Sequence, residues 1–209
     1  MSGKYVHLQR GIITACESFS VRESEGWRTA CVKNAAGPEK PVNFAIEAVL
    51  DEAWRIAELE ARLRTRSFEI SSSYRWRAGG WGGVVSKSGQ SARDCHIPMA
   101  EGLEVYCPLA FFDGLLFRRL NLPAASQIRI ELLEVREEGL ETIQTYRIIE
   151  RLDDEPARWC GQSLIASRYR ITDPAGEVEG VWVHPGGACL WRRTAEGDER
   201  YRLLELSKA

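Results

Sequence analysis

Residues 68–77 read FEISSSYRWR, and this stretch decides the fold class. Phe68, Ile70, Tyr74 and Trp76 occupy alternate positions, with charged or small polar residues between them. Successive side chains of a strand point to opposite faces, so this pattern predicts a half-buried strand with aromatic rings on its inner face.

The same period of two recurs along the chain. Residues 41–50 (PVNFAIEAVL) and 57–64 (AELEARLR) alternate in this way, and Asp51-Glu52 divides them. Similar turn signals, such as the Asp-Pro-Ala-Gly of 173–176 and the Pro-Gly-Gly of 185–187, follow at short intervals. Counting these runs predicts about eleven or twelve strands.

One segment breaks the alternation. Residues 108–120 read PLAFFDGLLFRRL, in which Leu109, Phe112, Leu116 and Leu120 recur at helical spacing, and Pro108 suits a helix start. This helix is apolar on nearly all sides, so we expect it to be buried.

These patterns predict an all-β fold with one short central helix. A dozen antiparallel strands must protect their edges, so we expect a strongly curled antiparallel sheet or an open barrel. The helix near 108–120 would cover or plug its interior. At 209 residues, we expect a single domain spanning 1–209. A barrel this wide is not filled by side chains alone, which favours a cavity.

Composition excludes several classes of function. The net charge of −2 argues against duplex nucleic acid as a partner, and no apolar run reaches the length of a membrane span. The first residues lack the apolar run of a signal peptide, so we expect a cytoplasmic protein. The six cysteines show no CxxC spacing, so we expect reduced thiols, no metal site and no cofactor. The oligomeric state is open, and a homodimer is one option.

Catalytic signals are sparse. No GxSxG, Walker, GxGxxG or HExxH motif occurs, and we assign no catalytic residue. Asp94 and His96 share a strand face and would form either an oriented base or metal pair, or a solvent-facing polar pair near a strand end. A buried carboxylate such as Glu47 or Glu131 is the other option for acid–base chemistry.

The order of four stretches resembles the bacterial glycolipid-binding family, whose fold is similar to the LolA and LolB lipoprotein carriers. The likeness covers roughly residues 40–190. The four stretches are 41–63 with Asp51, Trp54 and Arg55; 103–122 with Arg118 to Leu122; 140–152 with Gln144 and Tyr146; and 169–186, the closing hairpin. The chain departs from the family at 111–114, where Phe-Phe-Asp-Gly replaces polar Thr and Asn positions. The ligand would then be less polar than the family's.

The resemblance implies an apolar cavity that holds a lipid, glycolipid or other amphiphilic small molecule. Its expected ligand-binding residues are Phe44, Tyr74, Trp76, Phe111, Phe112, Arg118, Arg119, Gln144 and Tyr146. The arginines at the helix end would meet an anionic or hydroxylated head group. Alternatively, the rings fill a packed core, one arginine pairs with a carboxylate, and the other stabilises the helix C-terminus.

Three functions therefore remain. The first, which we favour, is non-catalytic binding of an amphiphile, and it needs an apolar cavity of hundreds of cubic ångströms. The second is a barrel-scaffold isomerase, lyase or hydrolase acting on an apolar metabolite, which needs a titratable pair facing such a cavity. The third is a ligand-free interaction module, which instead needs an exposed apolar patch.

Overall fold

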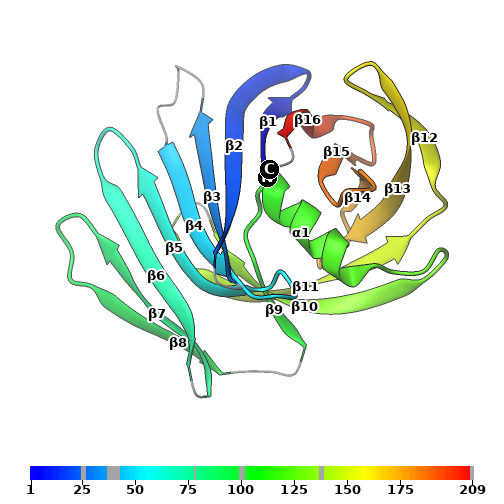
Figure 1. Ribbon diagram of the computed structural model, residues 1–209. Helices are drawn as coiled ribbons and strands as arrows, with labels where there is room; N and C mark the ends of the chain where they lie inside the picture. Colours follow the sequence, from blue (N-terminus) through cyan, green and yellow to red (C-terminus); the bar gives the residue numbers. More distant parts are fainter. Residues whose placement is uncertain (25–26, 37–42, 78, 99–101, 137–138, 208–209) are drawn as a thin grey trace.

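A computed structural model of the protein describes residues 1–24, 27–36, 43–77, 79–98, 102–136 and 139–207 (Figure 1). Within them lie sixteen strands and one helix. The strands are β1 (Ser2–Gln9), β2 (Ile12–Ser24), β3 (Trp27–Ala36), β4 (Asn43–Leu50), β5 (Ile56–Arg64), β6 (Glu69–Arg77), β7 (Gly80–Lys87), β8 (Arg93–Pro98), β9 (Leu103–Tyr106), β10 (Gln127–Val135), β11 (Thr142–Arg151), β12 (Glu155–Trp159), β13 (Gln162–Thr172), β14 (Val178–Val183), β15 (Cys189–Thr194) and β16 (Glu199–Ser207). The helix, α1, spans Ala110–Leu120.

All strands belong to one curled, unclosed sheet. Its order is β8-β7-β6-β5-β4-β3-β2-β1-β16-β15-β14-β13-β11-β10-β9, with β12 pairing only β13. The first and last strands are hydrogen-bonded neighbours, and the sheet is open between β8 and β9, which follow each other in sequence. The pairs are antiparallel except β9 with β10, which run parallel because α1 crosses between them.

Two contacts join distant parts of the curl. The hydroxyl of Tyr74 on β6 donates a hydrogen bond of 3.0 Å to the backbone oxygen of Leu140, beyond β10. Arg93 on the edge strand β8 pairs with Glu141, next to Leu140. The strands β6–β8, on the left of Figure 1, are thereby tied to the β10–β11 hairpin.

The fold class predicted from periodicity is confirmed: a curled antiparallel sheet with one short helix. Burial alternates along β6, where Ile70, Ser72 and Tyr74 are buried between more exposed neighbours. The structure has more strands than the predicted eleven or twelve, since short strands escape period counting. Examples are β9, with 4 residues, and β12, with 5.

The helix α1 lies inside the curl (Figure 1), and its residues from Ala110 to Phe117 are buried. It ends at Asn121, which adopts a left-handed conformation (φ 36°) and donates its N–H to the oxygen of Phe117. Gly114 lets the helix backbone approach the β14–β15 turn. A Cβ there would lie 3.0 Å from the oxygen of Gly187. The helix is therefore packed backbone against backbone on one side.

Candidate binding site along the buried helix

A buried glutamate holds the start of the helix. Glu17 on β2 is 0% exposed, and its carboxylate accepts hydrogen bonds from the backbone N–H groups of Ala110 (3.1 Å) and Phe111 (2.8 Å). His7 Nε2 on β1 lies 2.9 Å from the same carboxylate. The first N–H groups of a helix lack partners within the helix and carry partial positive charge, so a carboxylate is a favourable cap.

A second buried carboxylate, in the first turn of the helix, also ties α1 to the sheet. Asp113 is 2% exposed and accepts hydrogen bonds from the hydroxyl of Tyr106 (2.6 Å), the hydroxyl of Tyr201 and the guanidinium of Arg192 (2.8 Å). Arg192 also pairs with Glu179, so the network runs outward across β15 and β14. Two carboxylates therefore fix the N-terminal half of α1 to the sheet.

Burial sets the protonation state of this network. Burial, followed by the charge of Asp113, raises the pKa of the Tyr201 and Tyr106 hydroxyls well above their ordinary value. Burial alone would lower the pKa of Arg192, but the Asp113 carboxylate beside it raises that pKa overall. The tyrosines thus stay neutral donors and Arg192 stays a cation. Each group already has a partner, which indicates a structural role.

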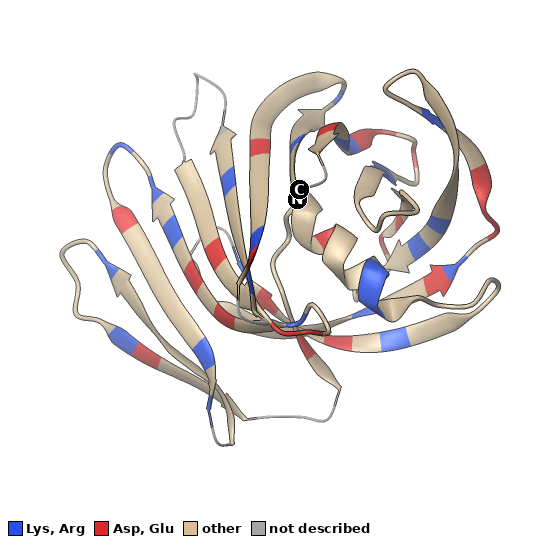
Figure 2. Ribbon diagram, in the orientation of Figure 1, with Lys and Arg blue, Asp and Glu red and all other residues tan. Residues whose placement is uncertain are grey.

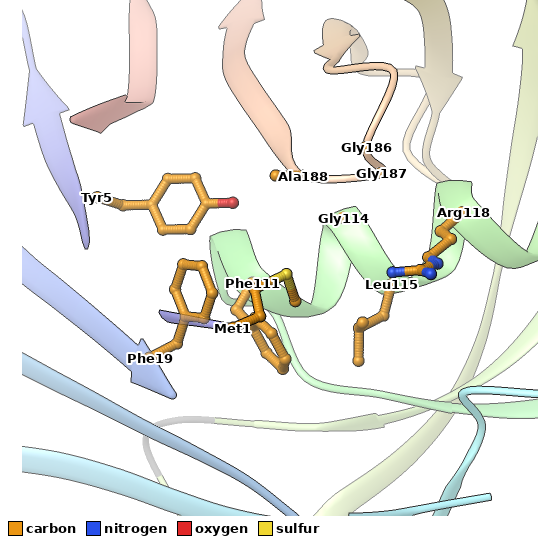
Figure 3. Close-up of a pocket in the computed structure, with 10 residues that line it drawn as sticks. All are labelled: Met1, Tyr5, Phe19, Phe111, Gly114, Leu115, Arg118, Gly186, Gly187 and Ala188. Atoms are coloured by element: carbon orange, nitrogen blue, oxygen red, sulfur yellow. The ribbon is translucent and has the colours of Figure 1, made fainter. Parts of the chain in front are cut away.

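A small apolar cavity lies on one side of α1, and Figure 3 shows its lining. The rings of Tyr5, Phe19 and Phe111 meet at one end, with centroids of Phe19 and Phe111 4.8 Å apart. Leu115 follows along the helix, and Arg118 stands at the other end. The space open to the centre of a water-sized sphere is about 10 Å³, enough for about one water molecule.

A second cavity of about 10 Å³ lies on another side of the same helix. Its lining residues are Trp54, Ile56, Val105, Tyr106, Phe112, Leu115, Leu116 and Arg119. Leu115 lines both cavities. We call the two spaces the Phe111 cavity and the Phe112 cavity.

The two arginines at the helix end differ in their partners. Arg119 forms an ion pair with Glu104 on β9 (2.8 Å), and its side chain is only 11% exposed. Burial raises the pKa of Glu104 and lowers that of Arg119, so pairing does not fully offset the loss of water. Arg118 is exposed and stacks on the ring of Trp54, with its guanidinium carbon 4.2 Å from the ring centroid.

Trp54 belongs to the turn between β4 and β5. Asp51 accepts hydrogen bonds of 2.8 Å from both the backbone N–H and the side chain of Arg55. The turn places Trp54 at φ 64°, a conformation that L residues rarely adopt. Its ring also receives Arg28, at 4.5 Å. The Asp51, Trp54 and Arg55 motif found in the sequence thus builds a turn over the helix end.

The fold has relatives among solved structures. A DUF1089 family protein from Pseudomonas aeruginosa matches with a TM-score of 0.57 and 15% identity, covering 88% of this chain and 91% of that chain. A β-barrel-like protein of the domain of unknown function DUF1849, from Brucella abortus, matches with a TM-score of 0.58 and 10% identity, covering 100% and 96%. The likeness is one of fold. No family model and no curated protein matches the sequence.

The structure brings four of the expected ligand-binding residues to the cavities. Phe111 and Arg118 line the Phe111 cavity, and Phe112 and Arg119 line the Phe112 cavity. The linings also include Tyr5, Phe19 and Leu115, which sequence reasoning missed. In the sequence, Phe19 and Leu115 follow ordinary strand and helix patterning, and nothing further marks them as cavity-lining residues.

The other five expected residues lie elsewhere. Phe44 and Tyr74 are buried in the core, and Trp76 is half-buried, packing edge-on against Trp81 and donating to the backbone oxygen of Ile56 (3.0 Å). Gln144 is exposed. Tyr146 is half-buried beneath Arg129, on the opposite face of β11 from buried Ile149. None of the five lines either cavity.

The groups considered for acid–base chemistry do not form a site. Asp94 and His96 are exposed on the edge strand β8, the solvent-facing arrangement weighed above. Glu47 is exposed, and the side chain of Glu131 is 35% exposed and pairs with Arg129 (3.0 Å), so the expectation of burial was wrong for both. Among the described residues the buried carboxylates are Glu17 and Asp113, and each already has hydrogen-bond partners from other elements of the fold. Within the described ranges, no three His, Cys, Asp or Glu residues are placed to hold a metal ion.

Proposed function

We propose that this protein binds a small amphiphilic molecule along α1, without catalysis. The observation that carries the proposal is the pair of apolar cavities flanking the helix, each with an arginine at its end. Aromatic and aliphatic linings with a few placed polar groups are typical of small-molecule sites. The fold supplies the frame: a curled sheet around one central helix.

The two halves of α1 are held differently. Polar contacts from Glu17, Tyr106, Tyr201 and Arg192 fix the first half. The second half packs through apolar side chains: Leu115 and Leu116 line the cavities, and Phe117 packs on Tyr169, with ring centroids 4.5 Å apart. Apolar contacts are non-directional and can be exchanged for contacts with an apolar chain. We infer that a ligand enters by displacing the side chains of Leu115 and Leu116, while the helix backbone and the polar contacts of α1 stay in place.

Room for a ligand must come from such a displacement. The cavities hold about one water each, far below the roughly 300–1,000 Å³ of typical ligand pockets. The structure therefore represents a closed form under this proposal. The resemblance to the glycolipid-binding family supports a lipid or glycolipid as the ligand class, and the replacement of polar residues by Phe111 and Phe112 favours a less polar one.

Leu115 offers a direct test because it lines both cavities. Leu115→Ala should enlarge them and strengthen binding of a long-chain fatty alcohol, while Leu115→Trp should fill them and weaken it. The control is Leu59→Ala on β5, a buried leucine that lines neither cavity. Calorimetric titration of the three folded variants would decide. Equal affinities in all three would refute binding along α1.

A ligand-free interaction module is the second candidate, and the small cavity volume favours it. Ile12 and Ile13, beside the β1–β2 turn, are exposed apolar residues that such a module would use. Native mass spectrometry of freshly purified protein separates the candidates. A co-purified amphiphile of defined mass supports the first. Bare protein that no amphiphile stabilises in thermal unfolding supports the second.

No helix among the described residues has the length and hydropathy that a membrane crossing requires.

A further inference from the structure

We propose that the Phe111 cavity selects an amphiphile with an oxyanion head group, carboxylate or phosphate, and that Arg118 is its anchor. This inference rests on the proposed function and names its ligand class. Two faces of α1 repeat the same residue pattern with one difference.

The helix carries two parallel rows of side chains. Phe111, Leu115 and Arg118 stand at positions i, i+4 and i+7, which share one helix face, and all three line the Phe111 cavity. Phe112, Leu116 and Arg119 repeat this spacing one residue later and line the Phe112 cavity. Each row therefore offers an aromatic ring, an aliphatic side chain and a guanidinium in order along the axis.

The difference between the rows is the charge at their ends. Arg119 is neutralised by Glu104 at 2.8 Å. Among the described residues, no carboxylate oxygen lies within ion-pair distance of Arg118. The neighbouring charges are already matched, because Arg28 pairs with Glu23 (3.0 Å) and Arg55 with Asp51 (2.8 Å). Figure 2 shows the basic residues at this end of the helix. In the part of the chain that the structure describes, Arg118 is thus the cation at the rim of the Phe111 cavity that has no carboxylate partner.

The side chain of Arg118 is also held in place, unlike a typical surface arginine. A Cβ on Gly187 would lie 3.0 Å from Cδ of Arg118, so the arginine stem packs directly on that glycine in the β14–β15 turn. On the other side, the guanidinium stacks on Trp54 in the β4–β5 turn. Its guanidinium is therefore fixed between two turns, and a pre-positioned planar donor loses little entropy on binding an oxyanion.

The strained turn supports this assignment. A left-handed φ strains the backbone of a residue such as Trp54, and glycine would avoid that strain. The ring at this position is what Arg118 and Arg28 stack on. Glycine at position 54 would relieve the backbone strain, but it would remove the ring on which Arg118 stacks.

The test compares three amphiphiles of equal chain length: a fatty acid, an alkyl phosphate and a fatty alcohol. Each is titrated calorimetrically into the native protein and into Arg118→Gln. A charge-assisted hydrogen bond of about 1.5–3 kcal/mol corresponds to roughly 10- to 150-fold in affinity. We expect Arg118→Gln to weaken the two anions by at least about 10-fold and to leave the alcohol unchanged.

The matched control removes an arginine and its carboxylate partner outside both cavities, the Arg170–Glu150 pair (2.7 Å) of β13 and β11. The double variant Arg170→Gln with Glu150→Gln keeps net charge constant and should leave the anion preference intact. Equal loss of acid and alcohol in Arg118→Gln, or no loss of either, would overturn the oxyanion assignment while amphiphile binding stands. If the native protein binds none of the three, the proposed function fails, and this inference fails with it. A difference between acid and phosphate identifies which head group the site prefers.

Discussion

Replacing the buried glutamate that caps α1 should destabilise the whole fold. In Glu17→Gln, one amide oxygen replaces two carboxylate oxygens, so only one of the two backbone N–H groups keeps an acceptor. The other then faces the amide NH₂. A buried donor left unpaired costs about 1–3 kcal/mol, and loss of the negative charge at the helix start costs about 0.3–2 kcal/mol more.

Together these effects predict a loss of about 1–5 kcal/mol in the free energy of unfolding. In a chain of this size that corresponds to a fall of roughly 3–20 °C in Tm. Urea unfolding followed by tryptophan fluorescence gives the free energy. Hydrogen exchange should show faster exchange at the amides of Ala110 and Phe111.

The matched control is Glu47→Gln, on the exposed face of β4, which should change stability by less than about 0.5 kcal/mol. If Glu17→Gln costs no more than Glu47→Gln, the carboxylate does not cap the helix, and the account of how α1 is held is refuted. Loss of stability without faster exchange at the two amides would point to packing of the side chain instead.

Three further predictions concern α1 and its surroundings. Gly114→Ala should destabilise the protein by about 1–3 kcal/mol despite alanine's higher helix propensity, since its Cβ would press on the oxygen of Gly187; a rise in the urea midpoint would contradict this. Burial raises the pKa of the Tyr201 hydroxyl, so its contribution to stability is present below about pH 10 and is lost as pH rises further. Tyr201→Phe should therefore flatten the alkaline fall in the free energy of unfolding by up to about 1.4 kcal/mol per pH unit. An unchanged dependence of that free energy on pH would count against burial of the hydroxyl. Burial also raises the pKa of the Cys189 thiol, so a thiol reagent should modify exposed Cys160 in the native protein and Cys189 only after unfolding, as mass spectrometry of peptides would show.

The parts of the fold that follow from local patterning could be predicted from sequence. Strand alternation around Tyr74 and the helical spacing from Leu109 to Leu120 depend on neighbours in the chain. The strand registers that form the two cavities do not depend on neighbours in the chain, so local patterning does not predict them. Gln144 and Tyr146 were placed by resemblance, and β11 carries Tyr146 on the face away from Ile149.

The buried polar network around Glu17 and Asp113 could not be predicted from the sequence for the same reason. Glu17 is 93 residues from Ala110, and Tyr201 is 88 residues from Asp113. In the sequence, Glu17 reads as an ordinary polar residue of an alternating strand. Only the pairing of β1 with β16 and the placement of α1 inside the curl give these carboxylates their donors. The doubled spacing of Phe, Leu and Arg in α1 was visible in the sequence, but not which arginine would find a carboxylate.

The pairing of β1 with β16 also bears on how the chain folds as it leaves the ribosome. β1 to β8 are joined pairwise by hairpins, so they can associate as they emerge. β16 follows β1–β15 in the chain, and until it has been synthesised the free edge of β1 stays open to other strands. Tyr201, which bonds to Asp113, arrives with it. A nascent chain stalled before β16 therefore holds an unpaired edge and a carboxylate, Asp113, that lacks one of its three donors, and such a chain is a natural substrate for chaperones.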